Sequence, residues 1–178
     1  MQNHKNPRSS ATKEKIYYAL MTLLKTKKFN DIYVKDICAE AGINRSSFYE
    51  HYRDINDLMI KTEEKLSSGI SEIFNKSENF DRRCFIAFFE FICEHRDFYY
   101  AYLTYNEYTA MGQADFVKYL NSAQNQSEKD DDVQFHMAFF SGGLQAICKA
   151  WILTGMKKTP EQMTDIIFEE YKEKAKYF

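Results

Sequence analysis

Two short helical patterns joined by a glycine occupy residues 34–52, which read VKDICAEAGINRSSFYEHY. Gly42 favours a helix end, because glycine adopts the left-handed backbone conformation without a steric penalty. Asn44 is a favoured N-cap for the helix that follows. We therefore expect a sharp turn between two helices, with Ile43 as its buried pivot. The helix before the turn has a short apolar stripe at helical spacing: Ile37, Cys38 and Ala41.

The second of these helices is expected to have one inward and one outward face. Phe48 and Tyr52 are spaced i and i+4, so they share the face that packs on neighbouring helices. A helix this short is not stable alone and depends on that packing. Such an arrangement indicates either a helix-turn-helix that enters the major groove of DNA or a plain packed helical corner. The outward face carries Arg45, Ser46, Tyr49, Glu50 and His51.

The charge distribution favours the DNA-binding interpretation. Residues 1–53 hold 10 Lys and Arg against 5 Asp and Glu, whereas residues 54–178 hold 14 against 21. The net charge of −2 is therefore the sum of a basic segment at residues 1–53 and an acidic segment at residues 54–178. This asymmetry is expected of a nucleic-acid-binding module joined to another domain, although lysine-rich helices are often only solvated faces.

Composition predicts an all-α protein. The 178 residues include only 6 Gly and 2 Pro, and long stretches contain neither. A hydrophobic content of 44% is ample for the core of one or two compact units. The sequence contains no run of 18 apolar residues, and its first ten residues lack an apolar signal region, so we expect a cytoplasmic protein without a membrane segment.

No pattern of catalytic or metal-binding residues is visible. The cysteines form no CxxC pair, and the four histidines are scattered. We expect reduced, buried thiols, with a disulfide, a metal site or a thiol redox switch as the less favoured alternatives. We expect no enzymatic activity and no cofactor, because no nucleophile–base pair or phosphate loop is present. The cysteines are Cys38, Cys84, Cys93 and Cys148.

A first helix is predicted to open near Thr12, whose side chain can cap it. Lysines at positions 25, 27 and 28 suit the negative end of its dipole. Residues 1–11, including Lys5 and Arg8, are expected to form a flexible arm, either without a role or touching the minor groove or phosphates. The helix's apolar stripe comprises Ile16, Ala19, Leu20, Leu23 and Leu24.

Residues 12–60 resemble the three-helix DNA-binding domain of the TetR/AcrR family of transcriptional regulators. The segment GINRSSFYEHY is close to the family's pattern of Gly-aliphatic, four variable residues and Phe-Tyr-x-His-Phe. The resemblance places Phe48 and Tyr52 in the core. Many members have a phosphate-binding lysine where this chain has Ile55, and Arg53 is the candidate to compensate. The DNA-binding residues predicted by the motif and the resemblance are Lys35, Arg45, Ser46, Ser47, Tyr49, His51 and Arg53.

The chemistry of these residues predicts distinct roles. Arg45 suits a bidentate contact with guanine, and Glu50 suits the N4 amino group of cytosine. Ser46 can bond to several bases or to a phosphate. The remaining basic, tyrosine and histidine side chains are better suited to phosphates, which position the protein without specifying sequence.

The middle of the chain is exceptionally aromatic. A long fourth helix from residue 54 to residue 74 precedes it. Aromatic residues at helical spacing form either a core or, as the resemblance implies for this region, an effector pocket. The candidate pocket residues are Phe88, Phe89, Tyr99, Tyr102, Tyr105 and Trp151.

Two final helices are expected after a polar linker at residues 121–132. The first spans about 133–155, and the second begins at Pro160 with Thr159 as its N-cap. The glycines of Ser141-Gly142-Gly143 would let another helix approach closely. The resemblance implies that these helices form a four-helix dimer interface, and an intramonomer bundle is the alternative. The candidate interface residues are Phe140, Gly143, Leu144, Ile147, Trp151, Met163 and Ile167.

Together these patterns predict an all-α fold with an arm (1–11), a helix-turn-helix domain (12–54) and a helical ligand-binding and dimerisation domain (55–178). The predicted function is a dimeric repressor that reads a roughly palindromic site in double-stranded DNA and is released by an unidentified small-molecule effector. The alternatives are an activator, a coactivator or a protein-interaction adaptor on the same scaffold.

Overall fold

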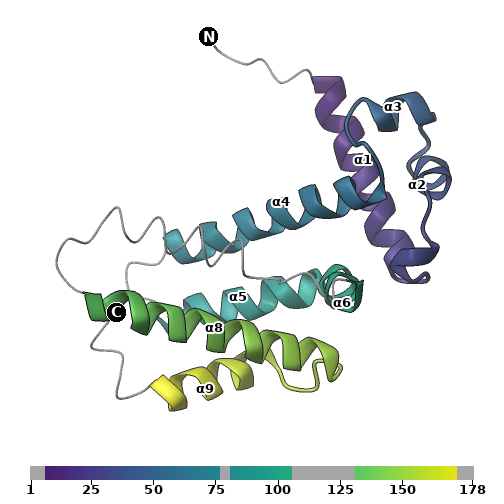
Figure 1. Cartoon of the computed structure of the whole chain (residues 1–178). Helices are drawn as coiled ribbons and strands as arrows, with labels where there is room; N and C mark the ends of the chain where they lie inside the picture. Colours follow the sequence, from purple (N-terminus) through teal and green to yellow (C-terminus); the bar gives the residue numbers. More distant parts are fainter. Residues whose placement is uncertain (1–6, 77–80, 106–130, 172–178) are drawn as a thin grey trace, which may run out of the picture. The chain divides into compact units, whose positions relative to one another are not determined.

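The computed structural model describes residues 7–76, 81–105 and 131–171, and every element in these ranges is helical (Figure 1). This confirms the predicted all-α fold. The chain divides into two compact units, unit 1 (Met1–Ser71) and unit 2 (Glu72–Phe178). None of the described helices is long and apolar enough to cross a membrane.

Unit 1 contains α1 (Pro7–Leu24), a 3-10 turn (Phe29–Asp31), α2 (Val34–Ala41), α3 (Arg45–Tyr49) and most of α4 (Ile55–Asn75). The predicted stripe of α1 is largely confirmed, because four of its five residues are buried and Leu23 is half-buried. The helix begins at Pro7 rather than near Thr12, since proline is well suited to a first helical turn. Arg8 therefore belongs to a helix, whereas Lys5 lies outside the described residues.

The turn between α2 and α3 is as predicted. Gly42 has φ 63° and ψ 40°, which is the left-handed conformation that ends α2. The amide of Ile43 donates to the carbonyl of Cys38 at 3.0 Å and closes the turn. Ile43 itself is half-buried rather than fully buried, because it lies in the turn beside an exposed glycine and an exposed asparagine.

Unit 2 contains α5 (Arg82–Glu94), α6 (Arg96–Tyr105), α8 (Asp131–Leu153) and α9 (Pro160–Tyr171). Asp81 caps α5 by accepting a hydrogen bond from the amide of Cys84 at 2.9 Å. The predicted cap of α9 is confirmed, since the Thr159 hydroxyl accepts from the Gln162 amide at 3.3 Å while the Gln162 side chain accepts from the Thr159 amide at 3.0 Å. The residues of the predicted linker before Asp131 lie outside the described ranges.

Aromatic rings form the core of unit 2. Phe89 of α5 is fully buried and meets the Trp151 ring of α8 edge-on, with 5.4 Å between ring centroids. Phe85 of α5 meets Phe140 of α8 and Phe168 of α9 in the same way, at 5.9 and 5.7 Å. These edge-to-face contacts join α5 to α8 and α9, which come much later in the sequence.

Candidate nucleic-acid interface

The helix α3 ends at Tyr49, earlier than predicted, so Tyr52 lies just after it, but the segment 45–52 still has an inward and an outward face. Phe48 has no exposed surface and Tyr52 is 9% exposed, which confirms that both side chains are in the core. Their rings pack on each other with centroids 5.6 Å apart. On the other face Arg45 is exposed and Tyr49 is 55% exposed. The inward pair therefore holds α3 in place while the outward face is open to a ligand.

Asn44 fixes the start of α3 and engages two of the predicted site residues. Its Oδ1 atom accepts hydrogen bonds from the Ser47 amide at 2.8 Å and from the Ser46 hydroxyl at 2.7 Å. Ser46 is exposed and Ser47 is half-buried. Because its hydrogen is given to Asn44, the Ser46 hydroxyl presents its lone pairs to any partner outside the protein.

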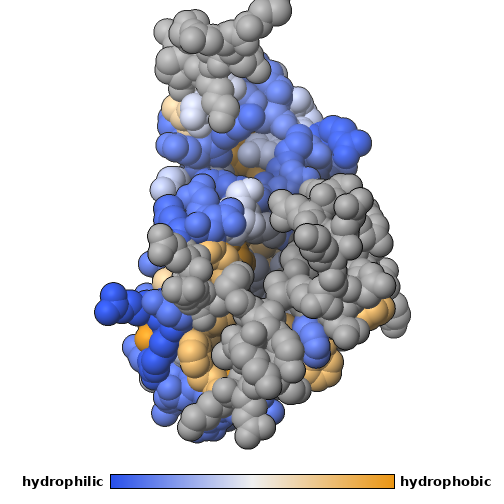
Figure 2. All heavy atoms as spheres, turned by 90° about the vertical axis from the view of Figure 1, so that its left-hand side faces the viewer, coloured by the Kyte–Doolittle hydropathy of each residue, from blue (hydrophilic) through white to orange (hydrophobic). Residues whose placement is uncertain are grey.

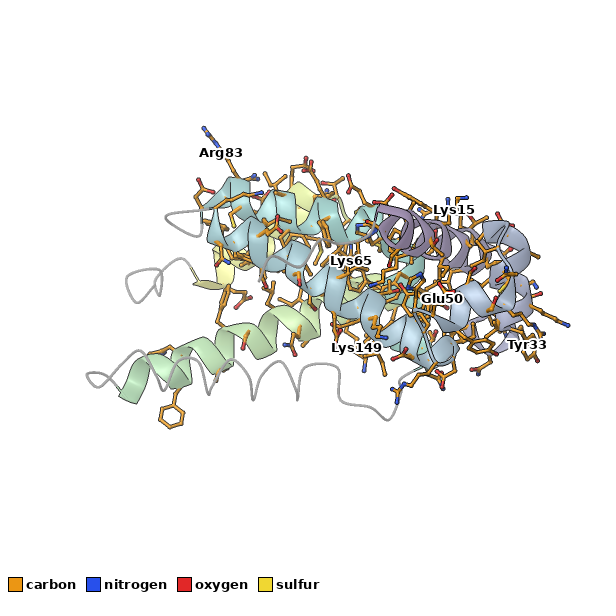
Figure 3. The ribbon with its side chains drawn as sticks, turned by 90° about the horizontal axis from the view of Figure 1, so that it is seen from above. Lys15, Tyr33, Glu50, Lys65, Arg83 and Lys149 are labelled. Carbon is orange, nitrogen blue, oxygen red and sulfur yellow. The ribbon has the colours of Figure 1, made fainter. Side chains whose placement is uncertain are left out.

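Lys35 is exposed in the first turn of α2, beside a residue that sequence reasoning missed. Tyr33 is the N-cap residue of α2, is 57% exposed and lies at the outer edge of unit 1 (Figure 3). The Lys35 Nζ atom is 5.5 Å from the centroid of the Tyr33 ring. Tyrosine is not a capping residue, so no sequence signal marked this position.

The entry to α2 is held by Asp36. Its carboxylate accepts the Tyr33 amide hydrogen bond at 2.9 Å and pairs with Lys27 at 3.3 Å. The Tyr33 hydrogen bond, followed by the Lys27 ammonium, lowers the pKa of Asp36 below its usual value. The backbone beneath Tyr33 and Lys35 is thus anchored at neutral pH.

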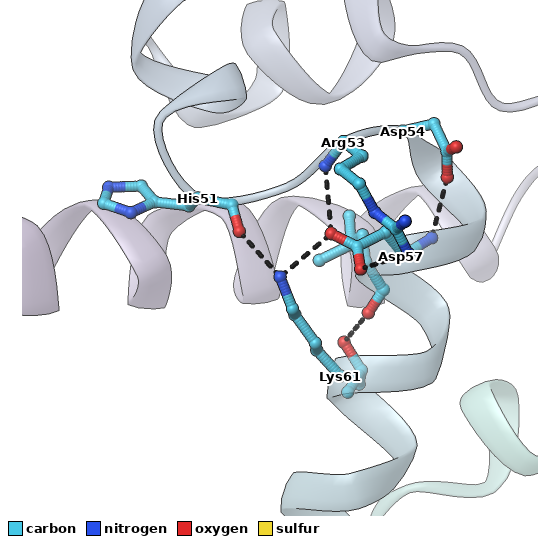
Figure 4. A network of polar contacts seen from close by, with 7 residues as sticks. His51, Arg53, Asp54, Asp57 and Lys61 are labelled. Carbon is cyan, nitrogen blue, oxygen red and sulfur yellow. Dashed lines mark hydrogen bonds and ion pairs between the residues drawn. The ribbon is translucent and has the colours of Figure 1, made fainter.

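A polar network follows α3 at the start of α4 (Figure 4). Its centre is the buried carboxylate of Asp57, which accepts hydrogen bonds from the Arg53 amide and the Lys61 ammonium, each at 2.9 Å. The same ammonium donates to the His51 carbonyl at 3.0 Å. Asp54 caps α4 by accepting from the Asp57 amide at 2.8 Å.

The network keeps Asp57 ionised. The hydrogen bond from the Arg53 amide, and then the one from Lys61, lower the pKa of the Asp57 carboxyl below its usual value. Sequence reasoning missed both Asp57 and Lys61. Their i and i+4 spacing on α4 is the usual signal of a helical ion pair, but it does not reveal that the pair also reaches the end of α3.

The remaining predicted contacts differ in exposure. Arg53 has a side chain that is 84% exposed, and its guanidinium lies 3.5 Å from Asp57 Oδ1. His51 and Ile55 are half-buried. Arg53 is thus an exposed cation close to the position where a family lysine was expected.

Four of the six candidate effector residues are in the core of unit 2. Phe88, Phe89, Tyr99 and Trp151 are buried, and the Trp151 indole donates to the Lys158 carbonyl at 3.1 Å. Tyr102 is half-buried and stacks on Phe98 with centroids 5.7 Å apart. The side chain of Tyr105 lies outside the described residues.

The candidate dimer residues divide into two groups. Trp151, Met163 and Ile167 are buried within unit 2, with exposed fractions of 4% or less. Their side chains are therefore already packed in a single chain. The others are half-buried: Phe140, Gly143, Leu144 and Ile147.

All four cysteines are free thiols. Three are buried, and Cys93 is half-buried. Burial raises the pKa of Cys148 to about 12, so this thiol stays protonated and unreactive at neutral pH. No group of residues able to hold a metal ion occurs within the described ranges.

The fold is similar to that of several solved regulators. One is described as "Dihydroxyacetone kinase operon activator DhaS", with a TM-score of 0.69 and 17% identity over 94% of this chain and 97% of the other. The fatty acid degradation regulator FadR from Bacillus halodurans has a TM-score of 0.60 and 12% identity over 94% and 95% of the two chains. A putative transcriptional regulator from Pseudomonas aeruginosa PAO1 has a TM-score of 0.59 and 19% identity over 97% and 93%.

The sequence itself carries a family signature in unit 2. Comparison with curated proteins finds no match. Residues 82–170, half of the chain, match the TetR family profile TetR_C_8, described as "Transcriptional regulator C-terminal region". The solved regulators share the fold over most of the chain, at 94% and 97% coverage. The chain therefore belongs to the TetR family of transcriptional regulators.

Proposed function

We propose that this regulator binds a specific, roughly palindromic site in double-stranded DNA through α3. The observation that carries the proposal is the geometry of α3. Phe48 and Tyr52 fix one face in the core, while Arg45 and Tyr49 occupy an exposed face. A short helix held in this way suits insertion into the major groove, where side chains near its N-terminus meet base edges.

The proposed contacts have separate roles. Arg45, in the first turn of α3, would read guanine through a bidentate contact, and Ser46 would accept a hydrogen bond from a base amino group. Exposed Glu50 would accept from the N4 amino group of cytosine. The other proposed contacts would hold phosphates and position α3 without reading sequence: Lys35, Ser47, Tyr49, His51 and Arg53.

We further propose that the active form is a homodimer joined through an exposed apolar stripe on α8. The stripe follows helical spacing and comprises Phe135, Phe139, Gly142, Ala146, Ala150 and Leu153. Phe135 and Phe139 are each 67% exposed, and Leu153 is 43% exposed. The opposite face of α8 holds the buried residues Cys148 and Trp151. An ordinary surface helix is polar on its outer face, so this stripe suits a covered position.

Small residues at the centre of the stripe favour a second helix as the covering element. A side chain at Gly142 would meet no heavy atom within 4 Å in the described chain. Gly142 and Gly143 were expected to allow close approach of another helix, and in this proposal that helix belongs to a second copy of the chain. Figure 2 shows hydrophobic residues at the surface of unit 2, in the lower part of that view. The stripe replaces the buried residues Trp151, Met163 and Ile167 as the proposed contact.

A two-fold dimer explains the proposed operator. Two copies of α3 related by a two-fold axis would read half-sites about 34–36 Å apart, or one helical turn of DNA, or somewhat more. An effector bound in unit 2 would release the dimer by favouring a state whose α3 helices no longer match that spacing. The proposal includes a cytoplasmic location, because the protein must reach its operator DNA.

Activation is the alternative sign of regulation. The solved regulator DhaS is named an operon activator, and it shares this fold. An activator would bind the same kind of DNA site and raise transcription through a protein partner. Transcription of a reporter behind the bound site separates the two, since a repressor lowers it and an activator raises it.

Selection of bound duplexes from a random DNA pool tests the proposed function. Enrichment of one motif with two inverted half-sites is expected. Recovery of no motif, with equal binding to all duplexes, would contradict sequence-specific binding. Repeating the selection with small molecules from a cell extract tests the effector, which should reduce recovery of the motif.

A further inference from the structure

The buried carboxylate of Asp57 has two cations beside it, and they are not equivalent. Its side chain is 8% exposed, so a nearby positive charge stabilises its ionised form. The Lys61 ammonium lies 2.9 Å from Oδ2, whereas the Arg53 guanidinium lies 3.5 Å from Oδ1. The shorter contact shows that Lys61 is the principal counter-charge.

Lys61 is also fixed by contacts outside the ion pair. Its ammonium donates to the His51 carbonyl at 3.0 Å and lies 5.3 Å from the centroid of the Tyr52 ring. The His51 carbonyl stands directly after α3, where a cation is favoured by the helix dipole. These contacts orient the ammonium between the end of α3 and the start of α4 (Figure 4).

Arg53, by contrast, is held mainly through its backbone. Its amide donates to Asp57 at 2.9 Å, while its side chain is 84% exposed. The backbone is thus anchored, and the guanidinium has only a long contact with a carboxylate that Lys61 already neutralises. Such a guanidinium can leave Asp57 for a phosphate without stranding a buried charge.

We propose that Lys61 is a positioning residue that keeps Arg53 available for the DNA backbone. Without the Lys61 ammonium, Asp57 would have Arg53 as its principal counter-charge, and the guanidinium would turn inward to pair with it. This inference rests on the proposed DNA binding. In this proposal Arg53 supplies the phosphate contact that a lysine at the position of Ile55 was expected to make.

A double-mutant cycle in the salt dependence of DNA binding tests the proposal. The proteins are the wild type, Arg53→Gln, Lys61→Met and the double variant. Each phosphate contact contributes about 0.9 to the slope of log affinity against log salt concentration. We expect Arg53→Gln and Lys61→Met each to lower the slope by about 0.9 per half-site, and the double variant to lower it no further.

Additive losses in the double variant would overturn the proposal, because they would show that Lys61 meets DNA independently of Arg53. An unchanged slope in Lys61→Met would overturn it as well. Lys61→Arg preserves the charge and should retain the wild-type slope. Lys65→Met is the matched control and should retain the wild-type slope. This exposed lysine of α4 contacts the Tyr17 ring, with its Nζ atom 4.0 Å from the ring centroid, rather than Asp57.

A measurement without DNA separates this inference from the proposed function. The pKa of the Asp57 carboxyl, followed by carboxyl NMR, should rise only slightly on Arg53→Gln in the wild type and markedly in the Lys61→Met background. Equal rises in the two backgrounds would overturn the inference even if the protein binds its operator. A wild type that binds no DNA would instead refute the proposed function, and the joint effect of Arg53 and Lys61 on the pKa of Asp57 could still be measured.

Discussion

At the scale of single residues, Gly42 carries the turn that places α3. Its φ of 63° lies in the left-handed region, and a side chain there would meet no heavy atom within 4 Å of the described chain. The requirement for glycine is therefore conformational rather than steric. This position was predictable because the rule that links glycine to a helix end is local.

Replacement of Gly42 tests that requirement. Gly42→Ala should lower the free energy of unfolding by about 1–2 kcal/mol, since alanine is strained in the left-handed region. Urea denaturation measures the change. Glu40→Ala is the control, because this exposed residue of α2 should change stability by less than about 0.5 kcal/mol. Equal stability of Gly42→Ala and the wild type would contradict the assigned conformation.

The ionised state of Asp57 predicts a pH-dependent contribution to stability. Its pKa is lowered in the folded protein, so its contribution is fully present above the unfolded pKa of about 3.9 and is lost as the pH falls through the folded value. Asp57→Asn should therefore be less stable than the wild type at pH 7, and the difference should shrink below about pH 4. Urea denaturation at several pH values measures it, and a difference that does not vary with pH would contradict this role.

At the scale of elements, hydrophobic spacing predicted α1, α2, α3 and α4 because each has a clear buried face. The start of α1 was misplaced at Thr12, since a plausible capping residue there competed with Pro7 as the first residue of the helix. The division between α5 and α6 at His95 was not predicted. No glycine or proline marks it, and the apolar pattern continues on both sides.

The aromatic core of α5 and α8 gives a prediction at this scale. Phe89→Ala should lower the free energy of unfolding by about 3–5 kcal/mol, because the ring is fully buried against Phe88 and Trp151. Tyr100→Ala is the control, since this aromatic residue of α6 is 53% exposed. A loss of less than about 1 kcal/mol for Phe89→Ala would contradict the core assignment.

At the scale of the whole molecule, sequence reasoning reached the family but not the surfaces that would join copies. The pattern of α8 is apolar on several sides, so it did not reveal which residues the other helices of unit 2 would cover. Only the packed structure distinguishes buried Trp151 from exposed Phe139. The Lys61 network was not predicted for a similar reason, because it depends on the His51 carbonyl in the turn that follows α3.

A charge placed in the α8 stripe tests the dimer. Ala146→Arg should convert the protein to a monomer without lowering the stability of its fold, since residue 146 is exposed in the single chain. Sedimentation velocity measures the oligomeric state. Gln145→Arg adds the same charge at the neighbouring exposed position, outside the stripe, and should remain a dimer. A dimer that survives Ala146→Arg would place the interface elsewhere.

In the proposed function, α3 reads the sequence of DNA. This role is tested most directly by the affinities of the wild type, Arg45→Ala and Lys35→Ala for the selected site and for a scrambled duplex. We predict that Arg45→Ala loses about 1–3 kcal/mol per half-site on the selected site only, whereas Lys35→Ala weakens both duplexes alike and lowers the salt slope by about 0.9 per half-site. Unchanged discrimination by Arg45→Ala would contradict the account.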